Sequence, residues 1–159
     1  MAIYNKFNNS TTELAKSLAI ETDDIDWAEG LIMEVYMTIE DPKVYFRTTN
    51  SFRFRNNDSL IFECIGTHFL NKNYWLTLSS IKLKKFIIDN NGIKEEWWDL
   101  HIFDMSQKYE DETPALLIRA KEFNLYEVEV ERNDKGEIID RPTLVDFLKW
   151  KEEQEKQKS

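Results

Sequence analysis

Cysteine, histidine and glycine are scarce in this chain of 159 residues. The single cysteine, Cys64, excludes an intramolecular disulfide, and two histidines argue against a zinc site built only from protein ligands. The four glycines are too dispersed to form a phosphate-cradling loop. No apolar run approaches the roughly 18 residues of a membrane span, and the N-terminus lacks the apolar stretch of a secretory signal. We therefore expect a cytoplasmic protein without membrane contact.

Apolar residues make up 42% of the chain and aromatic residues 13%, which is too much for a disordered protein. A chain of this length hides roughly 70% of its unfolded surface, so a real core is expected. We find no linker and no internal repeat. The sequence predicts one domain over residues 1–150, followed by a charged, solvated or frayed helical tail over 151–159.

Alternation of apolar and polar residues over 31–105 predicts an antiparallel meander of five or six strands. Residues 74–89 form one long strand in this prediction, broken or bulged at Ser79-Ser80. Asparagines and a glycine at 90–92 predict a hairpin turn, with 93–105 as the returning strand. In residues 31–39, alternation places Leu31, Met33, Val35, Met37 and Ile39 on one side.

Helix signals occur at three places. A capping box formed by Ser10 and Glu13 begins an N-terminal helix over about 11–20. Pro114, after a threonine, fits the start of a middle helix, and Pro142 opens the last one. We expect an α+β fold in which a curved antiparallel meander, open or closed into a half-barrel, is covered by short N-terminal, middle and C-terminal helices.

Residues 43–85 are basic, with 8 basic and 2 acidic side chains, although the whole chain has a net charge of −9. Cations that neutralise phosphates and aromatic faces that stack on bases are typical of sheets that bind single-stranded nucleic acid. The alternative is that the aromatic rings fill the core and the cations lie on the solvent-exposed face of the sheet. The candidate anion-binding residues are Lys43, Arg47, Arg53, Arg55, Tyr74, Lys82 and Lys84.

Acidic clusters and one tryptophan are the candidates for binding another protein. Small acidic proteins can oppose a basic surface on a larger protein, and charge steering raises their association rate. Alternation sends Trp97 and Trp98 to opposite faces, so one ring reaches the surface, where tryptophan is enriched in binding hot spots. The alternative is a solvated surface without a partner. The candidate residues are Asp23, Asp24, Asp26, Glu29, Trp97, Glu127, Glu129 and Glu131.

Catalytic and metal signals are weak. Cys64 and His68 have a Cys-x3-His spacing but too few further ligands for a closed site. Cys64 lies in an apolar strand, which favours a small buried side chain over a nucleophile. We expect no catalytic residue, metal or cofactor, and the sequence leaves the oligomeric state open.

Residue usage favours an origin in an AT-rich genome, with 15 Lys against 6 Arg, 15 Ile, 12 Asn and only 6 Ala. Together with the acidic surface, this predicts a small accessory protein of a phage or mobile element. It would inhibit or block a larger protein, as anti-defence and immunity proteins do. The alternative function is a nucleic-acid or polyanion-binding module that uses the sheet face of residues 43–85.

Overall fold

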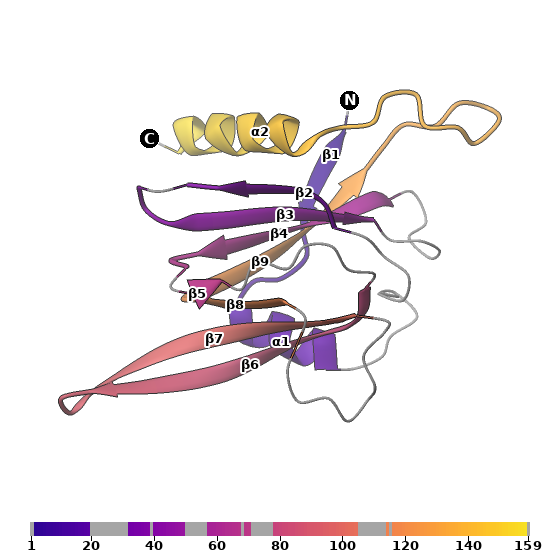
Figure 1. Ribbon diagram of the computed structural model, residues 1–159. Helices are drawn as coiled ribbons and strands as arrows, with labels where there is room; N and C mark the ends of the chain where they lie inside the picture. The colour runs from indigo at the N-terminus through magenta and orange to yellow at the C-terminus, as the bar shows by residue number, and fades with distance from the viewer. Residues whose placement is uncertain are drawn as a thin grey trace.

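In the residues that it describes, the computed structural model of the protein has two antiparallel sheets and two helices (Figure 1). It describes residues 2–19, 32–38, 40–49, 57–67, 69–70, 78–104, 114 and 116–158. Strands dominate these residues, and one helix lies near each end of the described chain. The predicted α+β class is confirmed.

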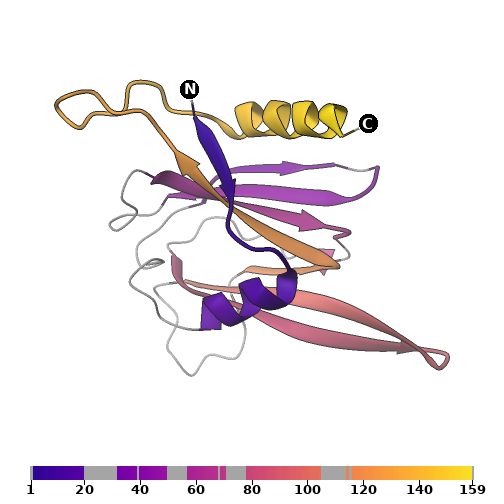
Figure 2. The ribbon, with the colours of Figure 1, turned by 180° about the vertical axis from the view of Figure 1, so that it is seen from behind.

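The first sheet has five strands and joins both ends of the chain. Its order is β1 (Ile3–Lys6), β9 (Glu122–Glu129), β4 (Asn57–Ile65), β3 (Lys43–Thr49) and β2 (Ile32–Met37), all antiparallel. In β3 and β9, consecutive side chains are buried, which shows that both faces of this sheet are covered. One face meets the second sheet and the other meets the C-terminal helix (Figure 2).

The second sheet has four strands and carries a projecting hairpin. Its order is β5 (Phe69–Leu70), β8 (Leu116–Ala120), β7 (Ile93–Asp104) and β6 (Leu78–Asn90). β8 pairs with β7 only from Trp98 to Ile102. The far ends of β6 and β7 therefore extend beyond β8 as a two-stranded arm (Figures 1 and 2).

The hairpin and its bulge follow the sequence prediction. The arm turns at Asn91 and Gly92, whose φ angles of 54° and 86° lie in the left-handed region that asparagine and glycine tolerate. The register of β6 on β7 shifts between Leu78 and Ser80, at the predicted bulge. The predicted turn, bulge and returning strand are all confirmed.

The prediction of one continuous meander is wrong, because the strands divide between two sheets. β4 pairs with β3 and β9, not with β5, which follows it in the chain. The chain passes between the sheets from β8 to β9 at Lys121, whose backbone N–H donates to the Ile65 carbonyl at 3.0 Å. Neither sheet closes on itself, so a half-barrel is not confirmed.

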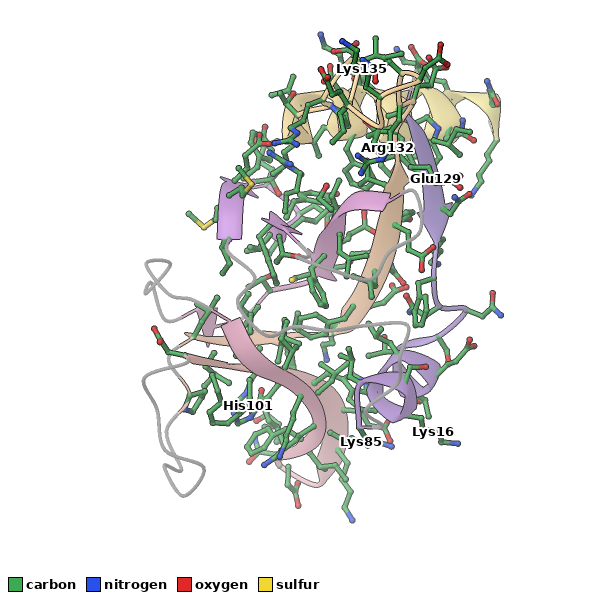
Figure 3. The ribbon with its side chains drawn as sticks, turned by 90° about the vertical axis from the view of Figure 1, so that its right-hand side faces the viewer. Lys16, Lys85, His101, Glu129, Arg132 and Lys135 are labelled. Atoms are coloured by element: carbon green, nitrogen blue, oxygen red, sulfur yellow. The ribbon has the colours of Figure 1, made fainter. Side chains whose placement is uncertain are left out.

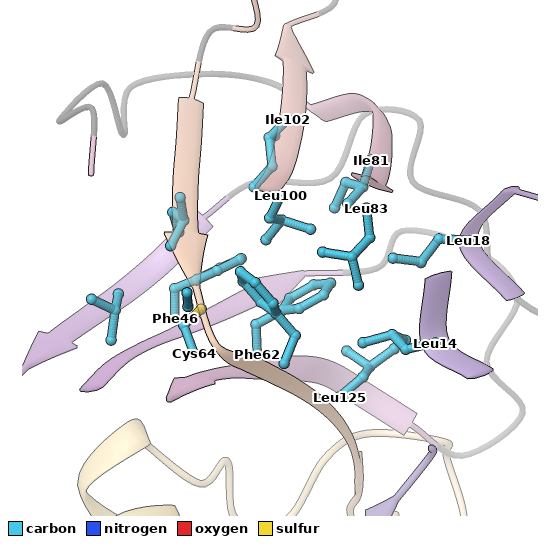
Figure 4. Close-up of a cluster of buried hydrophobic side chains, with 14 of the residues drawn as sticks. Leu14, Leu18, Phe46, Phe62, Cys64, Ile81, Leu83, Leu100, Ile102 and Leu125 are labelled. Atoms are coloured by element: carbon cyan, nitrogen blue, oxygen red, sulfur yellow. The ribbon is translucent and has the colours of Figure 1, made fainter. Parts of the chain in front are cut away.

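The main hydrophobic core lies between the two sheets (Figure 4). Phe46 and Phe62 of the first sheet are fully buried and stack with ring centroids 4.7 Å apart. Leu100 of the second sheet faces them, and burying one such side chain contributes about 1.5–3 kcal/mol. Cys64 is fully buried in this core, as predicted, and burial raises the pKa of its thiol well above the usual value.

Helix α1 (Thr11–Ala19) closes one end of this core. The predicted N-cap is present, since the Glu13 N–H donates to Ser10 Oγ at 3.1 Å, but the Glu13 carboxylate accepts from the Asn9 N–H at 3.4 Å, one residue before the Ser10 N–H that a full capping box uses. Leu14 and Leu18 then enter the core. The predicted N-terminal helix is confirmed.

Helix α2 (Leu144–Gln157) lies on the opposite face of the first sheet (Figure 1). It begins with a capping box between Thr143 and Asp146, and Phe147 is fully buried against Tyr45 and Tyr126. The predicted C-terminal helix is confirmed, and it continues through most of the segment predicted as a tail.

The predicted middle helix is wrong, because β8 occupies its position. Leu116, Ile118 and Ala120 are fully buried at every second residue, which is the period of a strand and not of a helix. The local helix-start signal at Pro114 was outweighed by pairing of this segment with β7 on one side and β5 on the other.

The predicted faces of the strand over residues 31–39 also need correction. The register shifts between Ile32 and Glu34, which is a bulge in β2. Ile32 and Val35 therefore both pack against the core, whereas Met33 is 47% exposed. An extra residue reverses the alternation on one side of a bulge, and the sequence gives no local sign of it.

Candidate functional site

The second sheet turns one face to the core and the other outward. On β7, Trp98, Leu100 and Ile102 pack toward the core, so their neighbours in the strand point the opposite way. Directly opposed residues on β6 and β8 share the same side. We call this surface the outer face, and its members are Lys82, Lys84, Phe86, Trp97, Asp99, His101, Leu117 and Arg119.

Neither described helix covers the outer face. Helix α1 packs with Ile81 and Leu83 on the core side of β6, and α2 lies on the first sheet. Figure 3 shows His101 on the side of β6 and β7 away from Lys16 of α1. Phe86 accordingly keeps 39% of its surface exposed.

Arg119 is held in place on the outer face by two neighbours. Its Nε donates to Asp99 Oδ1 at 2.7 Å and its Nη2 donates to Asp99 Oδ2 at 2.8 Å. The guanidinium carbon also lies 3.9 Å from the centroid of the Phe86 ring, a contact that contributes about 0.5–1 kcal/mol at an exposed site. The hydrogen bonds to Asp99 raise the pKa of Arg119. The three side chains form an ordered unit before any partner binds.

Trp97 has a similar arrangement with Lys121 and Glu95. The Lys121 ammonium lies 3.9 Å from the Trp97 ring centroid and 3.5 Å from Glu95 Oε2. The Trp97 indole N–H donates to the same carboxylate at 3.3 Å. Glu95 therefore neutralises Lys121 and orients the indole, which is half-buried.

Lys82 and Lys84 form the basic part of the outer face. Both are exposed, and neither forms an ion pair with another described residue. His101 lies opposite Lys82, and its burial and the nearby Lys84 charge lower the pKa of the imidazole. The lowered pKa favours the neutral imidazole, so among the described residues of the outer face Lys82 and Lys84 carry the positive charge that no carboxylate pairs.

These groups can bind a partner through apolar contact and charge, but they do not form a catalytic pair. Asp99 is already held by Arg119, and the described outer face contains no hydroxyl or thiol nucleophile. Over the described parts of the chain, no three histidine, cysteine, aspartate or glutamate side chains are grouped to hold a metal ion.

A second concentration of polar groups lies between α2 and the first sheet. Glu63 of β4 is 1% exposed, accepts a hydrogen bond from Asn124 Nδ2 at 2.9 Å and pairs with Lys151 Nζ at 3.2 Å. Lys151 also donates to the Tyr126 hydroxyl at 3.1 Å. The buried carboxylate therefore has partners on both oxygens, as buried charges require.

Burial under α2 changes the titration of this region. It raises the pKa of Tyr4 to about 12 and also raises the pKa values of Tyr45 and Tyr126. Burial opposes the Lys151 ammonium, but Glu63 and Tyr126 together outweigh this effect, and the pKa of Lys151 is raised. A cavity of about 250 Å³ opens beside the cluster, between α2 and the β2–β3 hairpin. The paired groups anchor α2 to the sheet.

The structure brings together three residues that the sequence assigned to different functions. Trp97 was a candidate for protein binding, and Lys82 and Lys84 were candidates for anion binding, yet all three lie on the outer face. The predicted separation of Trp97 from Trp98 is confirmed.

Two other candidate cations are on the first sheet. Arg47 is 5% exposed, and its Nε donates to Glu34 Oε1 at 2.6 Å under α2. The expectation that Arg47 meets an anion at the surface is therefore wrong, because α2 covers that face. Lys43 lies at the rim of the cavity, 3.5 Å from Asp41.

The acidic candidates are only partly described. Glu127 and Glu129 are half-buried on β9 of the first sheet, where Glu129 accepts a hydrogen bond from Asn5 at 3.0 Å, and Glu131 is exposed. Their role in binding stays a prediction. The candidates that lie outside the described residues are Asp23, Asp24, Asp26, Glu29, Arg53, Arg55 and Tyr74.

Sequence reasoning missed Phe86, Arg119 and Lys121. Arg119 and Lys121 lie in or next to β8, which was assigned to a helix, so their place beside Asp99 and Trp97 could not be inferred. The alternation of apolar Leu116, Ile118 and Ala120 with Arg119 is the sequence signal that could have identified this segment as a strand.

Known proteins offer no further guide to this site. No family model, curated protein or solved structure matches the chain. Over the described residues, no helix combines the length and the apolar character that crossing a membrane requires.

Proposed function

We propose that the protein is a non-catalytic binding protein that docks on a larger protein through the outer face. The observation that carries this proposal is the ordered Arg119, held by Asp99 and stacked on Phe86 where neither described helix covers the sheet. Tryptophan and arginine are enriched in binding hot spots, and Trp97 lies on the same face. Because these side chains are already ordered, association costs less conformational entropy.

The charges of the outer face fit a protein partner better than a polyanion. Arg119 and Lys121 already have carboxylate partners, which leaves Lys82 and Lys84 to supply its charge. The net charge of −9 repels a polyanion at long range. A protein surface with a few carboxylates around an apolar patch matches this combination.

We further propose that docking blocks the partner, as an anti-defence or immunity protein of a phage or mobile element would. The residue usage of an AT-rich genome supports this origin. A cytoplasmic location is part of the proposal and is supported by the one cysteine, Cys64, which is buried and unpaired.

Comparative affinity capture tests the docking proposal. Wild-type protein and a Trp97→Ala, Phe86→Ala double variant are used to capture proteins from a host lysate, with Val145→Ala as control. Val145 is 54% exposed on α2, away from the outer face. We expect a protein that wild type and control retain equally and that the double variant loses at least tenfold. Equal retention by all three would contradict docking through the outer face.

Nucleic-acid binding is the second candidate, favoured by exposed Lys82 and Lys84 beside the Phe86 and Trp97 rings. It is tested with labelled single-stranded DNA, duplex DNA and RNA at about 50 and 200 mM salt, where phosphate contacts make affinity fall steeply. Binding that falls with salt and is lost in Lys82→Glu, Lys84→Glu would favour this candidate. No binding at low salt would exclude it.

A further inference from the structure

The longest open sheet edge in the described structure is β6. It has 13 residues, and among the described strands it pairs with β7 alone. The other strands at sheet edges are shorter: β1 has 4 residues, β5 has 2, and β2 has 6 and a bulge. Short or bulged edges are ways in which proteins prevent strands from adding to a sheet. β6 lacks both over Ile81–Asn90, so its backbone groups offer a template for another strand.

Charged lysine side chains, which also hinder the addition of strands to a sheet edge, are present on β6. Lys82, Lys84 and Lys85 are all exposed. If two copies of β6 paired antiparallel about Leu83, Lys82 of each copy would lie opposite Lys84 of the other, and like charges opposed on a sheet are destabilising. This pattern argues against self-association and leaves the edge open to a strand of opposite charge.

The two sides of β6 specify what such a strand would carry. Lys82 and Lys84 point to the outer face, so residues beside them should be acidic. Lys85 and Ile87 point to the other side, where Lys85 is already paired with Glu96 at 2.8 Å and Ile87, in the arm, is 54% exposed. An apolar side chain at the alternate positions would cover Ile87. The matching segment therefore alternates acidic and apolar residues.

We propose that β6 accepts an acidic, alternating β-strand from the partner protein, which extends the second sheet by one strand. The inference rests on the proposed function, since the added strand would come from the same protein that docks on the outer face. Main-chain hydrogen bonds would supply affinity, and the alternating side chains would supply specificity.

A synthetic peptide tests the inference without knowledge of the partner. The probe is a capped ten-residue peptide of alternating glutamate and valine. Its controls are a peptide of the same composition with the glutamates and valines in two blocks, and an alternating lysine–valine peptide. Amide hydrogen exchange of β6, followed residue by residue by NMR, reports whether the edge becomes paired.

We expect the alternating glutamate peptide to slow exchange at least tenfold at every second amide between Lys82 and Ile88, because alternate amides point to the open edge. The Lys82→Glu, Lys84→Glu variant should bind this peptide at least tenfold more weakly and should gain binding of the lysine peptide. Val145→Ala, on α2 and away from the second sheet, is the matched control and should leave this protection unchanged.

Three results would overturn the inference: no protection of β6 at millimolar peptide, equal protection by the blocked peptide, or unchanged binding in the lysine variant. Its failure is separate from failure of the proposed function. If Trp97→Ala, Phe86→Ala loses the captured protein while β6 stays unprotected by the peptide, docking stands and strand addition is rejected. If capture is unaffected, docking itself is rejected.

Discussion

The two sheets are made of similar alternating sequences, but their surroundings differ. In β3, Lys43-Val-Tyr-Phe-Arg47 lies between the core and α2, and Val44 through Arg47 are buried. In β6, Ile81-Lys-Leu-Lys84 has one buried and one exposed side, so both lysines reach solvent. The same polar–apolar alternation thus produces buried ion pairs in one sheet and an exposed basic surface in the other. A single helix, α2, makes this difference.

The largest expected contrast is between two phenylalanines on the two kinds of surface. Phe62→Ala removes a fully buried ring between the sheets and should lower the free energy of unfolding by about 3–5 kcal/mol. Phe86→Ala, on the outer face, should cost less than about 1 kcal/mol, mostly the contact with Arg119. Urea denaturation measures both. Similar losses would show that the outer face is as tightly packed as the core.

The next effect concerns the buried charges of the first sheet. Lys151→Met leaves the Glu63 carboxylate buried without its ammonium and should cost about 3 kcal/mol, the lower end for a buried pair, because Lys151 is 22% exposed. The control is Lys156→Met, whose exposed pair with Glu152 should contribute less than about 0.5 kcal/mol. A double Glu63→Gln, Lys151→Met variant should recover part of the loss. Equal effects of the two lysine variants would contradict a buried pair.

Alkaline pH should weaken the region under α2. The pKa of Tyr4 is about 12 in the folded protein against 10.0 ordinarily, so its stabilisation is complete below pH 10 and is lost as pH rises through 12. The pKa values of Tyr45, Tyr126 and Lys151 are raised in the same direction. We expect Tyr4→Phe to lose less stability than wild type between pH 9 and 11 in urea denaturation. An equal loss would mean that Tyr4 does not titrate under α2.

The smallest expected effect is a loss of stability at acid rather than alkaline pH, and it concerns His101 of the second sheet. The pKa of His101 is lowered by burial and by Lys84, so its stabilisation is present above the usual value of 6.5 and is lost as pH falls through the folded value. His101→Phe should therefore lose slightly less stability than wild type between pH 7 and 5. An NMR titration that finds the His101 pKa at or above 6.5 would contradict this.

The parts of the fold that depend on neighbouring residues were predictable from the sequence. The turn at Asn91-Gly92, the bulge at Ser79-Ser80 and the start of α1 each depend on a few adjacent side chains. The sheet partners were not predictable, because β9 pairs with β1 and β4 across long stretches of chain. Alternation reports which residues share a side of a strand, but not which strand lies next to it.

The same limit explains the candidate site. Lys82, Lys84 and Trp97 could be selected from alternation and residue type, and the structure places them on one face. The position of Arg119 beside Asp99 depends on the pairing of β7 with β8, and no local sequence pattern predicts that pairing. Arg47 was assigned to the surface because nothing near it in the sequence reveals that α2 packs above it.

The pairing of β1 with β9 also sets an order of events during synthesis. Lys6 leaves the ribosome long before Tyr126, its partner in the register. At about 5–20 residues per second, the first strand waits roughly 6–24 s for its neighbour. The core strands β3 and β4 are made within this interval, and the edge of β4 that pairs with β9 stays open until β9 arrives. Slowing translation between β4 and β9 should therefore prolong the exposure of this open edge and should reduce the yield of folded protein.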